Sequence, residues 1–163
     1  MKIGFGYDVH PLKVGEKLVL GGVTIPFSKG LQGHSDADAL VHAIIDALLG
    51  AAGLGDIGSH FPDSANEYKD ISSLILLENT KELLSENSLE IKNIDTTIVL
   101  EKPKLKNYIP EMKEKIAGKL KIKDRLISIK ATKEEGMGFV GEGKGIKVFA
   151  ICLLEEKELY EKS

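Results

Sequence analysis

Apolar and polar residues alternate along several segments of the chain in the way that β-strands require. The opening segment KIGFGYDVH is strand-like, and the short segments LVL and VTI are separated by Gly21 and Gly22, whose tolerance of positive φ angles favours a tight hairpin. Near the other end, LISIKAT alternates, and residues 146–154 are apolar enough for a strand covered on both faces. With the β-branched segment IDTTIVLE, these segments predict one sheet.

Three further segments have the composition of helices. Residues 36–52 are rich in helix formers, begin with acidic side chains that suit the helix dipole and end in a Gly-containing stretch. Residues 70–87 are rich in Leu, and residues 109–120 carry Pro110 in the first helical turn, where a missing amide proton does little harm. Since no repeat or linker divides the chain, we expect residues 1–163 to form a single domain of the α+β class, with a mixed β-sheet and helices packed on one face.

Composition narrows the classes of partner. The chain of 163 residues has a formal net charge of −3, which gives no basic surplus for a nucleic-acid backbone, and its apolar runs are far shorter than the ~18 residues of a membrane span. Cys152 is the single cysteine, so the chain cannot form an internal disulfide. The first residues do not have the basic segment followed by an apolar stretch that is typical of a secretory signal peptide. We therefore expect a cytoplasmic protein that binds neither nucleic acid nor membrane.

The opening strand carries a candidate metal site. Asp8 and His10 are two residues apart, so in a strand their side chains point to the same face and can approach one cation. The pair alone says little, because D-x-H arises often by chance. A surface Asp beside a half-buried His would explain it equally well.

The first predicted helix supplies a third candidate ligand. At ~100° per residue, Asp38, His42 and Asp46 share one side of this helix, with apolar residues opposite them and also among them. A helix that is apolar on both sides is usually covered on both sides, so the polar residues should be buried and either paired or bound to a metal. Asp8, His10 and His42 would form a zinc site with an open fourth position. Asp38 or Asp46 could orient an imidazole, or the polar residues could only cap the helix and pack against polar backbone.

Several loops contain residues that suit a phosphorylated ligand. His34 and Ser35 precede the first predicted helix, where an imidazole, a hydroxyl and free helix amides can address an anion. Alternatively, Ser35 or Asp36 only caps the helix. The segments EKPKLK and KATKEEGMGFVGEGKG each follow a strand and supply lysines, and the second also supplies Glu135 and many glycines. Such lysines are more often solvated and such glycines more often serve turns, so neither segment alone identifies a phosphate site.

Sequence segments spread over almost the whole chain carry a family resemblance. They are GYDVHPL, GGVTIP, GLQGHSDADALVHAIIDALLGAAGLGDIG, HFPDS, EKPKL and KAT with the following E-G-M-G-F and Gly-rich stretch. In order and spacing they resemble the 2-C-methyl-D-erythritol 2,4-cyclodiphosphate synthase family. The resemblance implies an enzyme that converts 4-diphosphocytidyl-2-C-methyl-D-erythritol 2-phosphate, a cytidine diphosphate ester, to the cyclic diphosphate with release of CMP. This step belongs to the non-mevalonate isoprenoid precursor pathway.

The resemblance also implies cofactors and assembly. Asp8, His10 and His42 correspond to the ligands of one zinc ion per chain, in agreement with the spacing, and Glu135 to a carboxylate that holds Mg²⁺ or Mn²⁺ at the diphosphate. His34 and Lys133 are the expected catalytic residues, although Lys133 stands where the family often has a Thr, so its role stays open. Family members are homotrimers with active sites at subunit interfaces and a fold like that of trimeric chorismate mutases.

The residues that contact the substrate are implied by the same resemblance. The methylerythritol phosphate part is expected against Ser35, Asp56, Ile57, Gly58, Phe61, Pro62, Asp63, Ser64 and Ala65. The cytidine and its phosphates are expected against Leu100, Glu101, Lys102, Pro103, Lys104, Leu105, Lys106, Thr132, Lys133, Glu134 and Glu135. Further contacts are expected from Asp8, Val9, His10, His34, Phe139 and Glu142.

One pair of residues departs from the family pattern. Glu142 and Lys144 stand where many relatives have Arg and Glu, so phosphate or channel contacts assigned to that Arg cannot be transferred. We expect the pair to lie in an extended segment with both side chains on one face, towards a channel along the threefold axis. In a trimer, the three Glu142 carboxylates would stand where relatives have three Arg side chains, and they would repel a prenyl diphosphate.

Two other functions fit some of these residues. A zinc phosphodiesterase that uses metal-bound water would fit Asp8, His10 and His42 equally well. A trimer that only senses nucleotides or prenyl diphosphates would fit the Gly-rich loops and the altered Glu142 and Lys144. The metal-binding residues together favour an enzyme over a sensor, and the wider resemblance favours the synthase over the phosphodiesterase.

Overall fold

The main sheet of the protein, in a computed structural model that describes residues 1–157, has five strands. Its order is β4-β1-β7-β5-β6, and only β5 and β6 are parallel, so the sheet is mixed as expected. The strands are β1 (Lys2–Val14), β4 (Lys29–Leu31), β5 (Leu89–Val99), β6 (Ile127–Thr132) and β7 (Gly145–Glu156). The expected hairpin is the separate pair β2 (Leu18–Leu20) and β3 (Val23–Ile25), with positive φ angles at Gly21 and Gly22.

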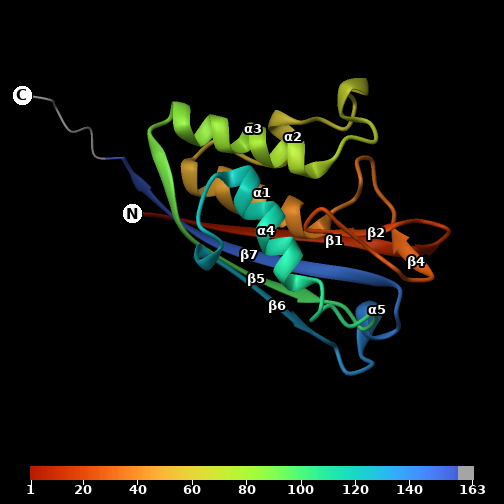
Figure 1. The fold of residues 1–163 in the computed structure, drawn as a ribbon. Helices are drawn as coiled ribbons and strands as arrows, with labels where there is room; N and C mark the ends of the chain where they lie inside the picture. Colours follow the sequence, from red (N-terminus) through yellow and green to blue (C-terminus); the bar gives the residue numbers. More distant parts are fainter. Residues whose placement is uncertain (158–163) are drawn as a thin grey trace, which may run out of the picture.

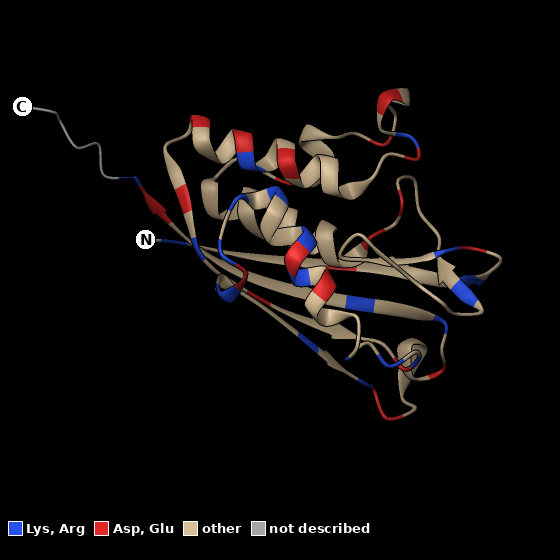
Figure 2. Ribbon diagram, viewed as in Figure 1, with Lys and Arg blue, Asp and Glu red and all other residues tan. Residues whose placement is uncertain are grey.

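Helices cover one face of this sheet (Figure 1), which confirms the α+β class. They are α1 (Ala39–Ala52), α3 (Ser73–Glu86) and α4 (Ile109–Leu120). Charged side chains lie along α3, α4 and the loops, whereas α1, packed against β1 and β7, is almost uncharged (Figure 2). Short turns complete the connections: α2 (Ile57–His60), α5 (Gly138–Gly141), η1 (Asn66–Tyr68) and η2 (Asp124–Leu126).

The two faces of β1 differ completely in composition. The even-numbered residues from Gly4 to His10 face the helices, whereas Ile3, Phe5, Tyr7 and Val9 point away from them. Two glycines allow α1 to lie against β1, since a Cβ atom on Gly4 or Gly6 would approach a backbone carbonyl oxygen of α1 to 1.8 or 1.9 Å. The close approach brings the start of α1 next to Asp8 and His10.

The outer face of the sheet carries apolar side chains and is not covered by α1, α3 or α4, although the short helix α5 packs on one end of it through Phe139 and Lys147. Phe5 is 61% exposed and Ile151 is 51% exposed, and the Phe149 ring lies 6.3 Å from that of Phe5 and 5.3 Å from that of Tyr7. The expectation that β7 is covered on both faces therefore does not hold for one chain by itself. β7 buries alternate residues and leaves the others on this outer face.

Several predicted boundaries shift in the structure. The first helix begins three residues later than expected because Asp38, and not Ser35 or Asp36, is its N-cap and accepts the backbone N–H of Val41. The alternating pattern of LISIKAT holds for Ile127 and Ile129, but Ala131 is exposed near the end of β6. None of the helices described is long and apolar enough to span a membrane.

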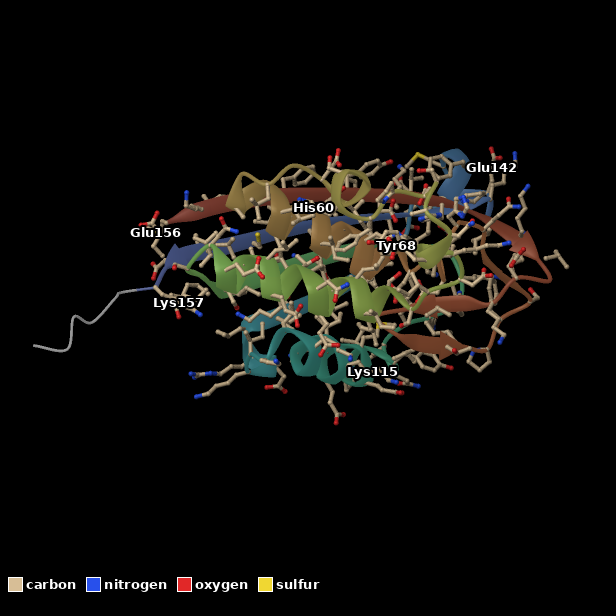
Figure 3. All side chains as sticks on the ribbon, turned by 90° about the horizontal axis from the view of Figure 1, so that it is seen from above. His60, Tyr68, Lys115, Glu142, Glu156 and Lys157 are labelled. Carbon is tan, nitrogen blue, oxygen red and sulfur yellow. The ribbon has the colours of Figure 1, made fainter. Side chains whose placement is uncertain are left out.

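The segment around Glu142 is not extended. Glu142 ends α5 with helical backbone angles, and Gly143 turns the chain with a φ of 71° before β7. The Glu142 carboxylate pairs with the Lys144 ammonium. Figure 3 places Glu142 at one end of the molecule, opposite Glu156 and Lys157.

Candidate metal centre and substrate cavities

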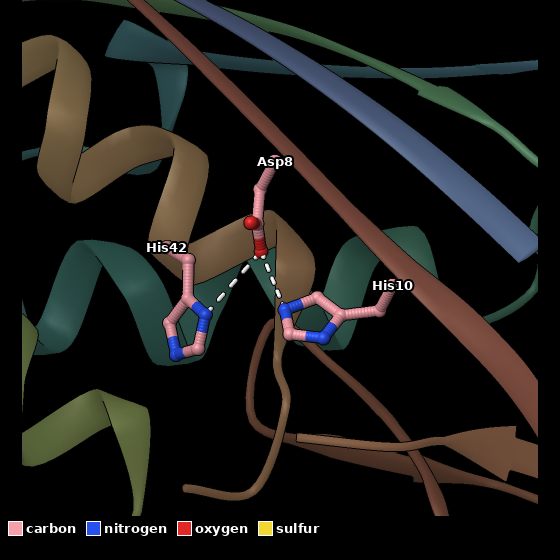
Figure 4. A group of neighbouring side chains, drawn as sticks. All are labelled: Asp8, His10 and His42. Carbon is pink, nitrogen blue, oxygen red and sulfur yellow. Dashed lines mark ion pairs between the residues drawn. The ribbon is translucent and has the colours of Figure 1, made fainter. Parts of the chain in front are cut away.

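Asp8, His10 and His42 come together where α1 begins to cross β1 (Figure 4). His10 Nε2 lies 2.9 Å and His42 Nδ1 lies 3.3 Å from the same oxygen, Asp8 Oδ2, and all three candidate ligand atoms lie within 4.8 Å of one another. Ligands held at the usual zinc distances of about 2.0–2.2 Å in a tetrahedron are separated by roughly 3.3 Å. The cluster therefore has nearly the dimensions of a zinc site.

The polar atoms at the centre of this cluster lack good partners. Asp8 Oδ2 and His10 Nε2 are buried, and neither forms a well-aligned hydrogen bond with any described residue despite their short separation. Buried polar atoms are rarely left without a partner unless an unseen ion or water satisfies them. The donor set of one carboxylate and two imidazoles is the one zinc commonly takes, so these residues fit a zinc ion.

The charges in the cluster reinforce this fit. Burial alone would raise the pKa of Asp8, but the imidazoles of His10 and His42 lower it below the usual value. Burial would lower the pKa of His10, but Asp8 raises it above the usual value. The Asp8 carboxylate is therefore ready to bind a cation, and a cation at this position would compete with protonation of His10.

In each imidazole, the ring nitrogen that points away from the cluster has a hydrogen-bond partner. That partner is not the carboxylate of Asp38 or Asp46, which the sequence suggested. His10 Nδ1 contacts the carbonyl oxygen of Gln32 at 2.9 Å, and His42 Nε2 contacts Ser73 Oγ at 2.8 Å and Ser35 Oγ at 3.1 Å. The carboxylates of Asp38 and Asp46 instead bind backbone.

Asp38 and Asp46 fix the segments on either side of the centre. Asp38 caps α1 and also accepts the backbone N–H groups of Gly21 and Gly22 in the β2–β3 hairpin. Burial, with repulsion from Asp36, raises the pKa of Asp38 to about 6, while the hydrogen bonds from these amides oppose the shift. Asp46 accepts the N–H of Ile57 at 2.8 Å and so anchors α2. The alternative of capping and packing against polar backbone was therefore correct for both.

A cavity of about 190 Å³ opens over the cluster. His34 and Ser35, both predicted, line it from the loop before α1, together with four members of the predicted methylerythritol phosphate group: Ile57, Gly58, Phe61 and Asp63. Asp56 caps α2 through Ser59 and does not line the cavity, and neither do Pro62, Ser64 or Ala65 in the same loop. Val9 points to the outer face of the sheet.

A second cavity, of about 170 Å³, lies at the ends of β5 and β6. It brings together most of the residues predicted to hold the cytidine: Leu100, Glu101, Pro103, Lys104, Leu105, Lys106, Thr132 and Lys133. Lys102 instead lines a third cavity, together with Glu142. Within one chain the first and second cavities have no lining residue in common.

The remaining predicted residues follow β6. Glu135 is exposed, has a positive φ of 53° and lies outside the Asp8, His10 and His42 cluster. Glu134 pairs with Lys147 at 2.9 Å, and its N–H donates to Glu101 at 3.2 Å. The Phe139 ring lies below the Lys147 ammonium, at 5.2 Å. This loop therefore packs onto the end of β7.

Three residues of the site were not predicted. Tyr68 and Leu76 line the first cavity, and the Tyr68 ring stands edge-on to that of Phe61 at 5.6 Å. Ser73 contacts His42. The Ser72-Ser73 pair before a Leu-rich segment was a usable sign of a helix start, but nothing in the local sequence pointed from Ser73 to His42.

Comparisons with known proteins agree over nearly the whole chain. The model of the YgbB family matches residues 1–155. The chain is 59% identical to a protein of Clostridium novyi and 57% identical to one of Clostridium botulinum, both named 2-C-methyl-D-erythritol 2,4-cyclodiphosphate synthase; the matches cover 96% and 95% of this chain and 100% of each relative.

Solved structures give the same result. An IspF of Plasmodium falciparum, in complex with CDP, superposes with a TM-score of 0.85 at 36% identity, over 96% of this chain and 97% of that one. The bifunctional IspDF of Campylobacter jejuni superposes with a TM-score of 0.91 at 39% identity, and 95% of this chain covers 42% of that chain.

Proposed function

The chain belongs to the YgbB family, and from this premise we propose that it is a 2-C-methyl-D-erythritol 2,4-cyclodiphosphate synthase that acts in isoprenoid biosynthesis. The observation that carries the proposal is the cluster of Asp8, His10 and His42 beneath a cavity, in a chain 59% identical to a relative of that name over the relative's full length. The substrate is 4-diphosphocytidyl-2-C-methyl-D-erythritol 2-phosphate.

The reaction joins two phosphoryl groups of one molecule. An oxygen of the 2-phosphate forms a bond to the β-phosphorus of the diphosphate, and the bond from that phosphorus to the bridging oxygen breaks, so that CMP leaves and no water is consumed. The main obstacle is the repulsion between two anionic groups, which placed cations and donors reduce. No residue has to form a covalent intermediate.

The residues of the first cavity bind and orient the phosphate that attacks. Asp8, His10 and His42 would hold one zinc ion, which when bound neutralises and positions phosphate oxygens. The exposed His34 imidazole and the Ser35 hydroxyl line the same cavity as further donors. Phe61 and Tyr68 give it an apolar wall against the carbon skeleton.

The residues of the second cavity suit the cytidine diphosphate end. Lys104, Lys106 and Lys133 supply positive charge, and the mainly apolar ends of β5 and β6 supply a surface for the base. Glu135 would hold Mg²⁺ or Mn²⁺, whose charge stabilises the departing CMP phosphate. Where many relatives have a Thr whose hydroxyl polarises the phosphoryl group, this chain has Lys133. Its ammonium group would contact the β-phosphate instead.

We propose that the enzyme is a homotrimer whose active sites lie between subunits. The two groups of predicted substrate contacts surround separate cavities in one chain, which supports a site that takes one group from each of two chains. The apolar outer face of the sheet is the type of surface that a protein buries in an assembly. The unpaired Cys152 agrees with a reducing compartment, the cytoplasm.

Incubation with the cytidine diphosphate substrate tests the function directly. Formation of the cyclic diphosphate and CMP in equal amounts is the expected result. A linear phosphate product would instead support a phosphodiesterase, and unchanged substrate with tight binding would support a sensor.

Mixing two inactive variants tests the shared site. His34→Ala chains and Glu135→Ala chains are each expected to be inactive, because each removes one half of every site. After mixing and exchange of subunits, some sites receive both intact residues and activity should partly return. Monomers in sedimentation, or a mixture that stays as inactive as its parents, would exclude shared sites.

A further inference from the structure

Side chains of Asp36, Ser73 and His42 form a continuous chain behind the proposed metal site. Ser73 is the first residue of α3 and is fully buried. Its Oγ lies 2.8 Å from His42 Nε2 and within hydrogen-bond distance of Asp36 Oδ1. His42 presents its other nitrogen, Nδ1, to Asp8 Oδ2 at 3.3 Å. The two edges of the imidazole therefore face two different groups.

The direction of these hydrogen bonds follows from the donors available. Asp36 already accepts the backbone N–H of Ser73 through Oδ2 at 2.9 Å and that of Asp38 through Oδ1 at 3.1 Å. An ionised carboxylate has no proton to give, so the single hydroxyl proton of Ser73 must go to Asp36. Ser73 Oγ can then only accept from His42, which requires the proton of the neutral imidazole to sit on Nε2.

Ser35 is compatible with the same direction. Its Oγ lies 3.1 Å from His42 Nε2 and accepts the backbone N–H of Ala37 at 3.4 Å, so it is a second, longer acceptor for the same ring proton. Neither serine requires an Nδ1 proton. The lone pair of Nδ1 is then available to a cation held between it, Asp8 and His10, whereas without a cation the Asp8 carboxylate at 3.3 Å favours a proton on Nδ1.

We propose that Asp36 and Ser73 are positioning residues that fix His42 in the Nε2–H tautomer and aim its Nδ1 lone pair at the metal. The inference rests on the proposed zinc site, because a fixed tautomer is useful only if Nδ1 is a ligand. A carboxylate that acts through a hydroxyl on the far nitrogen fixes the ring orientation and makes the near nitrogen a stronger ligand.

A purely structural role is the competing explanation. Asp36 also ties the loop before α1 to α3, since its N–H donates to Ile71 O at 3.3 Å and the Asp70 N–H donates to His34 O at 3.2 Å. Ser73→Ala separates the two roles. The backbone N–H of residue 73 and the loop contacts stay, and only the hydroxyl between Asp36 and His42 is lost.

The tautomer is measurable without a metal. In zinc-free Asp8→Ala protein with ¹⁵N-labelled histidine, which lacks the carboxylate that would compete for an Nδ1 proton, the His42 signals are identified by their loss when His42 is also replaced by Ala. We expect the ring in the Nε2–H form, and a mixture of both tautomers when Ser73→Ala is added. An Nδ1–H ring in the Asp8→Ala protein, or a ring still held as Nε2–H after Ser73→Ala is added, would overturn the inference.

Zinc affinity, measured by competition with a chelator, provides the second readout. We expect Ser73→Ala to bind zinc about 10- to 100-fold more weakly than the wild type, as is typical for loss of an outer partner of a ligand. Thr80→Val is the matched control, because Thr80 is also fully buried on α3 but its hydroxyl bonds only to Leu76 O within the helix, at 2.8 Å. Equal zinc affinity in the two variants would contradict the inference. A wild type without zinc affinity would refute the proposed function, while the tautomer measurement would still decide this inference.

Discussion

Both ring nitrogens of His42 have a defined partner, Asp8 on one side and the Ser35 and Ser73 hydroxyls on the other. The side chain is 14% exposed, so it lies within the wall of the cavity and does not move freely above it. Of the three proposed ligands, His42 is the one that lies on a helix, α1, and also contacts a second helix, through Ser73 of α3. His42 is therefore the ligand whose loss should be least compensated.

Replacing His42 by Ala should abolish zinc binding. Metal analysis of purified His42→Ala protein should show zinc falling from one ion per chain to nearly none. Turnover should fall by more than the ~100-fold that is typical when a ligand loses its hydrogen-bond partner. His60→Ala is the control, because His60 is also half-buried but lies outside the cluster: its Nε2 contacts Leu54 O at 2.7 Å and its ring lies against that of Phe61. Full zinc occupancy with normal turnover in His42→Ala would show that this ligand is assigned incorrectly.

The single cysteine should be inert in the folded protein. Cys152 is 1% exposed, its thiol donates to Ala47 O at 3.2 Å, and burial raises its pKa to about 11. A thiol-specific reagent at pH 8 needs an accessible thiolate, so native protein should react only as fast as it unfolds. Addition of denaturant should release one reactive thiol per chain, and stoichiometric labelling within seconds under native conditions would contradict the buried position.

At the level of single residues, the sequence predicted those contacts that depend on spacing within one element. Asp8 and His10 lie on one face because strands repeat every two residues. For Asp38 the spacing left two roles open, orienting an imidazole or capping the helix. The structure shows the second, because the Asp38 carboxylate accepts the N–H of Val41 as the N-cap. The role of Ser73 depends on a contact between residues 31 positions apart, and no local pattern records it.

At the scale of elements, the packing of helix α1 against strand β1 depends on the glycines at their contact. Gly6 lies two residues before Asp8 on the same face of β1, and α1 crosses it at the carbonyl oxygen of Ala43. The distance between β1 and α1 also sets the distance between Asp8 and His42. Packing and metal binding are therefore linked through this crossing.

A methyl group at Gly6 should push α1 away from β1. Because the added Cβ would lie 1.9 Å from a backbone oxygen, we expect Gly6→Ala to lower the free energy of unfolding by about 3 kcal/mol or more, at the upper end for overpacked sites, and to weaken zinc binding. Gly50→Ala is the control in α1, where the added Cβ meets nothing within 4 Å. It should raise stability by about 0.5–1 kcal/mol.

Urea denaturation with and without a chelator measures both variants. If Gly6→Ala were as stable as the wild type, the helix and strand would not be in the close contact described.

Among the elements, those with strong periodicity or clear end signals were predicted best. Helix α4 has the bounds that its Pro and Leu residues indicated, and the Gly-Gly hairpin is present. Helices α2 and α5 were missed because four residues are too few to display a helical period. The segment at Glu142 was expected to be extended, but α5 and Gly143 make it a turn.

At the scale of the whole molecule, the uncovered face of the sheet is the main unexplained surface of one chain. Its apolar side chains, Ile3, Phe5, Tyr7, Val9 and Ile151, are between 42% and 75% exposed. Sequence patterns indicated that β7 is apolar on both sides, but not that β1 and β7 are neighbours, because strand order arises from contacts between residues more than 130 positions apart. The mixed sheet could be predicted, whereas its order could not.

A charge on the uncovered face should separate the subunits. We expect Phe5→Asp to convert the proposed trimer to monomers in sedimentation and to reduce activity strongly, because the carboxylate would be buried against an apolar partner. Ile75→Asp is the control, since Ile75 is 43% exposed but lies on α3, among the helices. A Phe5→Asp protein that remains trimeric would place the subunit contact elsewhere.

Strand β1 has a consequence for how the sequence of this protein can change over time. In most half-exposed strands, every second position is free to vary, because one face meets only water. In β1 the inner face carries the helix contact and the two proposed metal ligands Asp8 and His10, while the outer face is the proposed contact surface between subunits. Substitutions on either face would therefore disturb a contact. We expect the nine residues from Lys2 to His10 to accept substitutions more slowly than a segment of the same length in any other strand of the molecule.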